Sequence, residues 1–271
     1  MGDLEDVIGE IRRSGYSADG FAERYDRYRP RPAPLLLELL PGLAGVDRLE
    51  LVVDLGSGTG LSTRFWAERA AEVVGVEPNP EMLSVAVAAT DAPNVSYRAA
   101  SAHDTGLPDG CADLVTCSQS LQWMEPEPTF TEIARILRPG RIFAAYEYRW
   151  SLTTSPAANA AFEATYERKH ELRAELGLDV GRTLWPVTRE RLVESGRFVA
   201  VDETVLHSIE EVDAERLVGF ALSEGSMTTL LASGVTEEQV GLDRLREAAA
   251  AGLGDRHSPW YLGYRLVVGW R

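Results

Sequence analysis

The fold is decided by one stretch of the chain, Leu51-Val52-Val53-Asp54-Leu55-Gly56-Ser57-Gly58-Thr59-Gly60-Leu61-Ser62-Thr63. An apolar strand runs into a glycine-rich turn, and the turn opens a helix. Glycines let the backbone adopt positive φ and approach a ligand closely. Open parallel sheets bind ligands in the crevice beyond the carboxyl ends of their strands. The stretch therefore predicts a ligand-binding loop in an α/β protein.

The residues around this loop discriminate between kinds of nucleotide site. No Gly-Lys-Ser/Thr follows the glycines, so a P-loop is excluded. A dinucleotide site favours a third glycine where Leu61 stands, and Asp54 would place a carboxylate beside the pyrophosphate. Both features count against NAD or FAD, so a nicotinamide oxidoreductase ranks last among the functions considered.

Two acidic residues favour a ligand of a different kind. Asp54 would attract a cation or an ammonium group in a partly desolvated crevice. S-adenosylmethionine (SAM) has that character. Glu77 ends the second predicted strand about 20 residues after Gly56, the spacing at which an acidic side chain accepts both ribose hydroxyls. We expect the two carboxylates to bracket the nucleoside.

The first half of the chain alternates short apolar runs with helix-like segments, a pattern typical of βαβ units. The strands are expected over residues 51–55, 72–77, 95–99, 113–117 and 142–148, with helices near 60–70, 79–89 and 126–137. Arg138-Pro139-Gly140 is expected to end the last of these helices and to turn the chain.

After residue 150 the pattern changes to amphipathic helices. These are expected near 157–176, 188–195, 212–222 and 236–251, with a strand-like run over 198–207 and a final strand over 260–270. Aromatic residues in this part either line an apolar acceptor pocket or form the core of a cap. They are Phe162, Tyr166, Trp185 and Phe220.

Three segments together resemble the motifs of class I SAM-dependent methyltransferases. Residues 53–60 look like the first motif of that family, and Glu77 resembles its second-strand ribose acid. Residues 101–115 are similar to its adenine loop and fourth strand. The match covers roughly residues 20–148 and is specific as a set. The resemblance is to the small-molecule branch, which includes trans-aconitate and natural-product methyltransferases.

The resemblance implies an α/β fold, namely a Rossmann-like, mostly parallel seven-stranded sheet with helices on both faces, an antiparallel last strand and a helical cap. We expect residues 1–45 to form a helical segment that contributes to a cofactor lid. Residues 46–150 would form the SAM-binding core. Residues 151–271 would supply the cap and the last two strands.

The resemblance also assigns the cofactor site. Residues 21–30 resemble the Tyr and Arg-Pro segment that small-molecule members place over the methionine carboxylate of SAM. Arg29 either clamps that carboxylate through its planar fork of donors or is an ordinary surface arginine. The expected contacts are Tyr25, Arg29, Asp54, Gly56, Ser57, Gly58, Thr59, Gly60, Glu77, Pro78, Met82, Ser101, Ala102, His103, Ser118, Gln119 and Ser120.

One position departs from the family pattern. The family often has an acidic residue where Ser101 stands, and that residue accepts the adenine amino group. Asp104 or the backbone of Ala102 and His103 could substitute, while Asp104 could equally be a loop cap.

The acceptor side is expected just past the fourth strand, in residues 118–124. Gln122 and Trp123 are the strongest candidates there, although a tryptophan is more often a core residue. Tyr146, Glu147 and Trp150 end the fifth strand at the same edge. Among His103, His170, His207 and His257, the first lies nearest the expected cofactor, although a solitary histidine is more often structural. The expected catalytic residues are Gln122, Trp123, Glu147 and His103.

Composition excludes several classes of partner. The chain has 27 Lys and Arg against 42 Asp and Glu, a net charge of −15, so a nucleic acid would be repelled. Cys111 and Cys117 are too few for a disulfide framework or a zinc site, and we expect no metal. The first 13 residues do not resemble a secretion signal, and no stretch reaches the length of a membrane span. We expect a cytoplasmic protein with no membrane contact.

The sequence thus predicts an enzyme that transfers the methyl group of SAM to a small-molecule acceptor and releases S-adenosylhomocysteine (SAH). The transfer would be an in-line displacement, for which positioning in a dry site is the main requirement. One alternative is an enzyme of the same fold that cyclises or cleaves SAM, or that catalyses a pericyclic step. Another is a non-catalytic SAM-binding protein. A monomer and a homodimer are both compatible with the sequence.

Overall fold

The computed structural model describes residue 9 and residues 14–149, 154–178, 188–254 and 257–271. These residues form a seven-stranded sheet in the order β3-β2-β1-β4-β5-β7-β6. The strands are β1 (Leu49–Leu55), β2 (Ala70–Val76), β3 (Val95–Arg98), β4 (Ala112–Ser118), β5 (Leu137–Tyr148), β6 (Ala200–Val212) and β7 (Ser258–Trp270).

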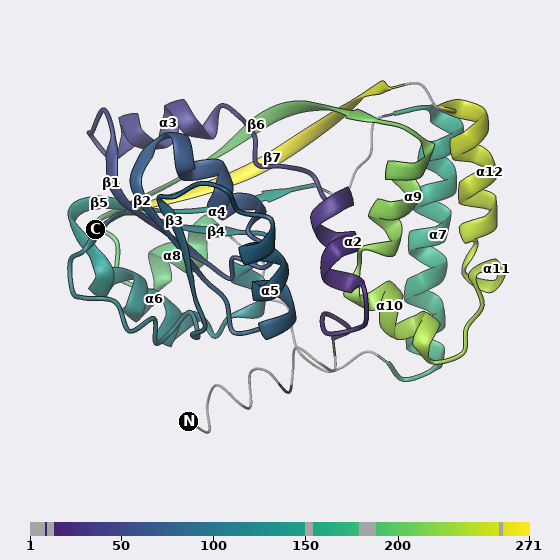
Figure 1. Ribbon diagram of the computed structural model, residues 1–271, viewed down its shortest axis with the longest axis horizontal. Coiled ribbons are helices and arrows are strands. Elements are labelled where there is room, and N and C mark those ends of the chain that lie inside the picture. The colour runs from purple at the N-terminus through teal and green to yellow at the C-terminus, as the bar shows by residue number, and fades with distance from the viewer. Residues whose placement is uncertain (1–8, 10–13, 150–153, 179–187, 255–256) are drawn as a thin grey trace.

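The first five strands pair in parallel, and β7 runs antiparallel to both β5 and β6 (Figure 1). The chain order reverses beside β1, because β2 and β3 lie on one side of it and β4 on the other. Such a switch point places the carboxyl ends of β1 and β4 beside an open crevice, where α/β proteins bind ligands. The predicted Rossmann-like sheet with an antiparallel last strand is therefore confirmed.

Helices lie on both faces of the sheet and in a separate cap. Those packed around the sheet are α3 (Leu36–Leu43), α4 (Leu61–Phe65), α5 (Pro80–Ala88), α6 (Pro126–Ile136) and α8 (Arg189–Glu194). The cap helices are α7 (Pro156–Glu175), α9 (Ala214–Leu222), α10 (Gly225–Ala232), α11 (Glu237–Val240) and α12 (Leu242–Gly252). Figure 1 shows α2 (Phe21–Tyr28) between the sheet and this cap.

Three details differ from the sequence prediction. The helix expected near 60–70 ends at Phe65 and continues only as a 3-10 turn, because β2 already begins at Ala70. The segment 138–141 does not leave the sheet. It forms a bulge within β5, since Ala112 pairs with Leu137 and Leu114 pairs with Ile142. Helix α10 was not predicted, because Gly225, Ser226 and Thr228 make its first half a poor helix former.

The two faces of the sheet follow from the two-residue period of its strands. Val52 and Ile142 point into one apolar cluster, while Val53 and Phe143 point into another. Helix α6 covers the second face with residues spaced three apart, which share one side of a helix. They are Phe130, Ile133 and Ile136.

The cap is continuous with the first of these clusters. The rings of Phe162 and Phe220 stack at 5.8 Å, and Trp260 packs edge-on against Phe220 at 5.1 Å. Trp260 belongs to β7, which extends with β6 from the sheet to the cap (Figure 1). Phe162 and Phe220 are thus core residues of the cap, while Trp185 lies outside the described residues. Within the described part of the chain, no helix combines the length and the apolar character that a membrane span requires.

Candidate functional site

The glycine loop between β1 and α4 takes the conformation that its glycines predict. Gly56 has φ +65°, and a Cβ at this position would lie 2.6 Å from the Cβ of Ser120. Ser120 lies beyond the end of β4 and donates a hydrogen bond to the carbonyl of Leu55 at 2.7 Å. The loop thus packs directly against the segment that follows β4, and only glycine fits there.

Asp54 lies beneath the loop rather than in the open crevice. Its Oδ1 accepts hydrogen bonds from Ser62 Oγ (3.1 Å) and Thr116 Oγ1 (2.7 Å), and its Oδ2 accepts one from Thr63 Oγ1 (2.7 Å). The residue is 1% exposed, and burial raises the pKa of its carboxyl to about 6. A carboxylate offers about four acceptor sites, so three hydroxyls leave one for a ligand or a water. Direct contact between Asp54 and SAM remains a prediction.

Glu77 directly follows β2 and reaches the glycine loop. Its Oε2 accepts a hydrogen bond from the Gly58 N–H at 2.9 Å, and its Oε1 accepts one from the Asn79 N–H at 2.9 Å. Burial, with a smaller contribution from the nearby Asp54, raises the pKa of this carboxyl to about 7, although the two backbone hydrogen bonds act in the opposite direction. Each oxygen therefore has one protein donor and keeps capacity for another. Asp54 acts electrostatically on Glu77, and the expectation that the two carboxylates bracket a nucleoside stays a prediction.

Two hydroxyls of the loop are buried without a protein partner. Among the described residues, neither Ser57 Oγ nor Thr59 Oγ1 has a hydrogen-bond partner. A buried polar group of this kind normally bonds to a ligand or an ordered water. These two hydroxyls fit a loop that cradles a polar ligand.

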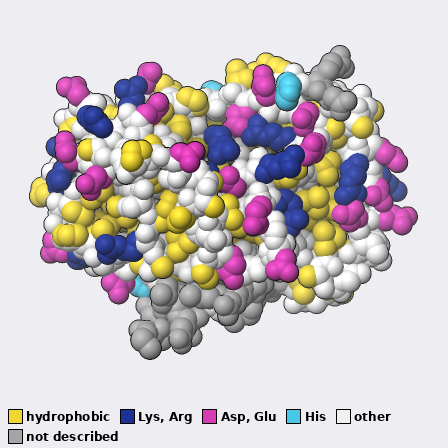
Figure 2. Space-filling model, in the orientation of Figure 1, with side chains coloured by type: hydrophobic (Ala, Val, Ile, Leu, Met, Phe, Trp, Pro, Cys, Tyr) yellow, Lys and Arg dark blue, Asp and Glu magenta, His cyan; other side chains and the backbone are white. Residues whose placement is uncertain are grey.

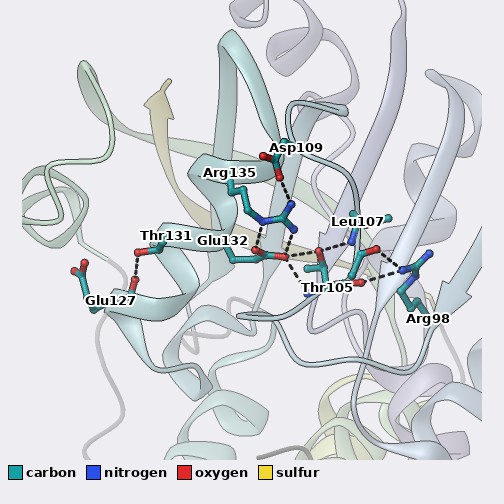
Figure 3. A network of polar contacts seen from close by, with 9 residues as sticks. Arg98, Thr105, Leu107, Asp109, Glu127, Thr131, Glu132 and Arg135 are labelled. Atoms are coloured by element: carbon teal, nitrogen blue, oxygen red, sulfur yellow. Dashed lines mark hydrogen bonds and ion pairs between the residues drawn. The ribbon is translucent and has the colours of Figure 1, made fainter.

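The expected adenine loop follows β3. Ser101 is buried, whereas Ala102 and His103 are partly exposed, and Ser101 and Asp104 form a short bridge. The end of this loop is held by Glu132 of α6 (Figure 3). Glu132 Oε1 accepts hydrogen bonds from the Thr105 N–H (2.9 Å) and the Thr105 hydroxyl (2.5 Å).

Arg135 completes this network on α6. It donates to both oxygens of Glu132, at 2.7 and 2.8 Å, and to Asp109 at 2.5 Å (Figure 3). Burial alone would raise the pKa of Glu132, but the hydrogen bonds from Arg135 and Thr105 lower it. An ionised Glu132 therefore fixes the loop to the helix behind it.

The segment after β4 has an unusual backbone. Gln119 has φ +56°, a left-handed conformation that is uncommon for a residue other than glycine. Its side chain donates to the carbonyl of Tyr148 at 3.4 Å, and Gln122 donates to its carbonyl at 2.9 Å. Strained backbone of this kind concentrates at functional sites. Ser118 is partly exposed at the end of β4, beside this turn.

Trp123 faces the N-terminal segment. Its ring packs edge-on against Tyr16 at 5.5 Å, and the backbone carbonyl of Tyr16 accepts a hydrogen bond from Asn79 Nδ2 at 3.3 Å. Gln122 Oε1 is buried and has no partner among the described residues. The predicted acceptor segment, residues 118–124, therefore contacts Tyr16, and Tyr16 is hydrogen-bonded to Asn79 just after the end of β2.

Arg29 is buried and makes contacts that the sequence did not predict. It donates to the Tyr148 hydroxyl at 2.6 Å and to the carbonyl of Ser223 at 2.7 Å. Its guanidinium also lies over the rings of Tyr25 (4.7 Å) and Phe220 (5.3 Å). Arg29 is thus not an ordinary surface arginine, and these contacts tie it to the cap and the end of β5. A contact between Arg29 and the carboxylate of SAM remains a prediction.

The end of β5 separates Tyr146 from Glu147, two of the three residues that the sequence grouped there. Tyr146 is buried under the loop, where its hydroxyl contacts Ser62 Oγ at 2.6 Å. Glu147 lies on the other face, paired with Arg265 at 3.8 Å, and burial raises the pKa of its carboxyl. The structure therefore does not bring Glu147 to Gln122 and Trp123. Trp150 lies outside the described residues.

The remaining residues that the sequence singled out lie in several parts of the structure. Met82 packs with Phe21 in a small cluster against Tyr25, and Pro78 lies partly exposed beside Glu77. His207, on the edge strand, and His257, near Glu211 at 3.7 Å, lie outside the candidate site. His170 packs against the ring of Tyr166.

Tyr16, Asn79 and Tyr148 were missed by the sequence analysis. Asn79 before Pro80 is a recognisable helix start, and its side chain indeed accepts from the N–H of Glu81 and Met82. Tyr148 could have been found because it shares a strand face with Tyr146. Tyr16 lies outside any periodic segment and carries no such signal. Among the described residues, no group of three or more His, Cys, Asp or Glu is placed to hold a metal ion.

Comparisons with known proteins agree with this geometry. Residues 53–145 match a family model described as "Methyltransferase domain". An uncharacterized methyltransferase of Mycobacterium tuberculosis is 39% identical over 117 residues, which are 43% of this chain and 45% of that protein. A trans-aconitate 2-methyltransferase of Azoarcus sp. is 37% identical over 119 residues, which are 43% of this chain and 44% of that protein. The chain thus aligns with less than half the length of these relatives.

Solved structures show the same fold. A provisionally assigned type II methyltransferase of Anaeromyxobacter dehalogenans superposes with a TM-score of 0.67 at 24% identity, covering 90% of this chain and 98% of that one. Phosphoethanolamine N-methyltransferase 2 of Haemonchus contortus, in complex with phosphomonomethylethanolamine and SAH, gives a TM-score of 0.53 at 18% identity. That match covers 96% of this chain and 59% of the other.

Proposed function

We infer that this chain, whose residues 53–145 match a model described as "Methyltransferase domain", is a class I methyltransferase that transfers the methyl group of SAM to a small-molecule acceptor. The match to the family covers the glycine loop, Glu77 and the segment after β4. The activity and the acceptor are our proposals.

The observation that carries this proposal is the position of Glu77. Its two oxygens each accept one backbone N–H and keep capacity for a further donor. Two neighbouring ribose hydroxyls supply such a pair of donors. The Gly58 N–H holds the carboxylate against the glycine loop, so the acid is already in place before a ligand binds.

The other residues of the loop fit the same ligand. Ser57 and Thr59 offer buried hydroxyls, and Asp54 places a carboxylate where it favours a cation. When bound, SAM would supply an activated methyl group on a positively charged sulfur. We assign the contacts to adenine to residues 101–103, which the Glu132 network holds in place.

The chain itself contributes binding, orientation and the exclusion of water. Trp123 and Tyr16 form an aromatic pair between the end of β4 and the N-terminal segment, which supports a role in covering the reacting atoms. Gln122 carries an amide that does not ionise near neutral pH, so it would orient the acceptor rather than act as a base. The main work of such a site is to align the acceptor with the methyl group.

We propose that residues 1–45 contribute the lid, that 46–150 form the cofactor core and that 151–271 supply the cap. One ion pair supports the lid, because Asp26 of α2 binds Arg64 of α4 at 2.6 Å. Arg64 also donates to the carbonyl of Thr59 at 2.6 Å, which links α2 to the glycine loop.

A small-molecule acceptor agrees with the names of two relatives. They are the trans-aconitate 2-methyltransferase and a malonyl-[acyl-carrier protein] O-methyltransferase of Serratia marcescens, which is 27% identical over 208 residues. The net charge of −15 also disfavours nucleic acid as the acceptor.

Isothermal titration tests the proposal. SAM and SAH should bind the purified chain with micromolar dissociation constants, and NAD should not bind under the same conditions. Conversion of SAM to methylthioadenosine in the absence of any acceptor, in which the methyl group stays on sulfur and the aminobutyrate side chain leaves, would point to cleavage of SAM instead. If neither SAM nor SAH binds, the proposed function is wrong.

A further inference from the structure

Arg64 connects the glycine loop to the N-terminal helix. It lies in α4, the helix that the glycine loop opens. Its Nη1 donates to the carbonyl of Thr59 in the loop at 2.6 Å, and its Nη2 donates to the carboxylate of Asp26 on α2 at 2.6 Å. The side chains of this ion pair are 18% and 19% exposed, so the pair is shielded from much of the solvent. One guanidinium thus binds the loop and α2 at the same time.

The third glycine of the loop makes room for this guanidinium. Gly60 has φ +83°, and a Cβ at this position would lie 2.8 Å from Nη1 of Arg64. The added Cβ would also meet the hydroxyl of Tyr97, which contacts Thr90 Oγ1 at 2.9 Å. Both neighbours belong to the protein. A glycine is therefore required here by the arginine as well as by the left-handed backbone.

The N-terminal segment is held at a second point, beside the proposed ribose acid. The carbonyl of Tyr16 accepts a hydrogen bond from Asn79 Nδ2 at 3.3 Å, and the Asn79 N–H donates to Glu77 at 2.9 Å. Asp26 lies farther along the same segment and reaches the glycine loop through Arg64. The segment is therefore tied to both of the elements that we assign to the cofactor.

Helix α2 is also attached to the cap, beside which it lies in Figure 1. The hydroxyl of Tyr28 donates to Glu215 at 2.8 Å, and Arg27 donates to the same oxygen at 2.6 Å. The side chains of Arg27 and Glu215 are 66% and 63% exposed, and exposed ion pairs contribute little. Of these two attachments, the pair of Asp26 with Arg64 is the more shielded and the better suited to fix α2.

The chemistry of the guanidinium fits a role in positioning. Arginine presents its donors in a rigid planar fork, whereas the ammonium of lysine is a point charge on a flexible stem. The fork fixes the carbonyl of Thr59 relative to the carboxylate of Asp26. If α2 moved away from α4, Arg64 would lose its carboxylate, and its hold on the loop would loosen.

We propose that Arg64 is a positioning residue that couples closure of the N-terminal segment to the binding of SAM. With Asp26 in place, Arg64 fixes the carbonyl of Thr59 and hence the shape of the glycine loop. This inference rests on the proposed function. Arg64 acts through the loop and the helix and not on the methyl group.

Calorimetric titration of the full chain with SAH tests the effect on affinity. Arg64→Met should raise the dissociation constant by about tenfold or more, and Arg64→Lys should lie between this variant and the unaltered chain. Arg141→Met is the matched control. Arg141 also joins a carboxylate, that of Asp113 (3.0 Å), to a backbone carbonyl, that of Ala44 (2.7 Å), but near the start of β4 and away from the site. Equal dissociation constants for Arg64→Met and Arg141→Met would overturn the proposal.

Hydrogen exchange separates positioning from a general loss of stability. Saturating SAH should slow the exchange of the α2 amides about fivefold or more in the unaltered chain. At the same occupancy by SAH, Arg64→Met and Asp26→Asn should keep the protection of β1 and lose that of α2. Protection of α2 by SAH in both variants, to the extent seen in the unaltered chain, would overturn the proposal.

A double variant tests whether the two residues act as one unit. Asp26→Asn/Arg64→Met should bind SAH no more weakly than Arg64→Met alone, because both changes break the same contact. Additive losses of affinity would mean that the residues act separately, which contradicts the coupling.

The outcomes distinguish this inference from the proposed function. Failure of the unaltered chain to bind SAH would refute the proposed function. Normal SAH binding by the unaltered chain and by Arg64→Met would refute the role of Arg64 alone.

Discussion

The backbone N–H of Gly58 donates a hydrogen bond of 2.9 Å to Oε2 of Glu77, so the glycine loop after β1 and the acid after β2 hold each other in place. The two residues come from adjacent parallel strands whose carboxyl ends meet at the same edge of the sheet. Asn79, which begins α5, donates to the other oxygen of the same carboxylate. The proposed ligand site is thus organised by the protein's own hydrogen bonds.

Replacing Glu77 should weaken SAH binding. Glu77→Gln gives up one oxygen acceptor, so one ribose hydroxyl or one backbone N–H loses its partner. A hydrogen bond to a charged group contributes about 1.5–3 kcal/mol, so the dissociation constant should rise by about 10- to 100-fold in calorimetry. Glu72→Gln, on the exposed side of β2, is the control and should leave affinity unchanged. Equal affinities of the two variants would exclude Glu77 from the site.

SAH affinity should depend on pH through the same residue. Burial raises the pKa of Glu77 to about 7 in the free protein, and ribose hydroxyls bind the ionised form. Binding therefore lowers this pKa and releases a proton, so affinity should rise about tenfold between pH 6 and pH 8. Calorimetry in buffers of different ionisation enthalpy measures the released proton. Glu77→Gln should abolish the release.

The stability of the ligand-free protein should fall as the pH rises, whereas the affinity for SAH should rise. Asp54 and Glu77 both have raised pKa values in the folded state, about 6 and about 7, so the native protein binds more protons than the unfolded chain between pH 4 and 7. Their contribution to the free energy of unfolding is therefore present below pH 4 and is lost as pH rises through 6 to 7. Between pH 5 and pH 8, urea denaturation of Glu77→Gln should show a smaller fall in stability than the unaltered protein. An equal fall in both would mean that Glu77 ionises normally.

The sheet and the loop were predictable because their signals are local. The apolar run before Gly56, the glycines and the period of the strands all lie within short windows of sequence. The pairing of Lys169 with Glu224 joins residues 55 positions apart, and the contact of Arg29 with Tyr148 joins residues 119 apart. No local pattern encodes such contacts. The surroundings of Glu147 could not be predicted for a related reason, since the face of a strand end depends on register with β7.

Gly56 should tolerate no side chain. Gly56→Ala combines a left-handed backbone with a clash against Ser120 and Met124, so it should lower stability by about 2–4 kcal/mol and abolish SAH binding. Gly110→Ala is a matched control, because its φ of +57° is similar and a Cβ there meets no atom within 4 Å. The control should cost about 1 kcal/mol in urea denaturation. If both variants lose the same stability, the close approach of Ser120 is unimportant.

The network on α6 should affect adenine binding more than catalysis. Glu132→Gln removes the charge that holds Thr105 and Arg135, and it should weaken SAH binding about 3- to 10-fold while kcat at saturating SAM changes little. Glu127→Gln, exposed on the same helix (Figure 3), should change neither. A fall in kcat without a change in SAH affinity would mean that Glu132 affects the transfer step and not the binding of adenine.

Charges of both signs lie on the face that Figure 2 shows. In the view of Figure 2, Lys and Arg side chains are interspersed with Asp and Glu and with apolar patches. This mixture and the net charge of −15 agree with an acceptor that is small enough to be recognised inside the molecule.

A crystal structure of the full chain with SAH bound is the most direct test of the account. We expect both ribose hydroxyls within hydrogen-bond distance of the Glu77 carboxylate, the adenine beside residues 101–103, and the sulfur directed toward Trp123 and Tyr148. SAH bound away from Glu77 and the Gly56–Gly60 loop would contradict the central claim.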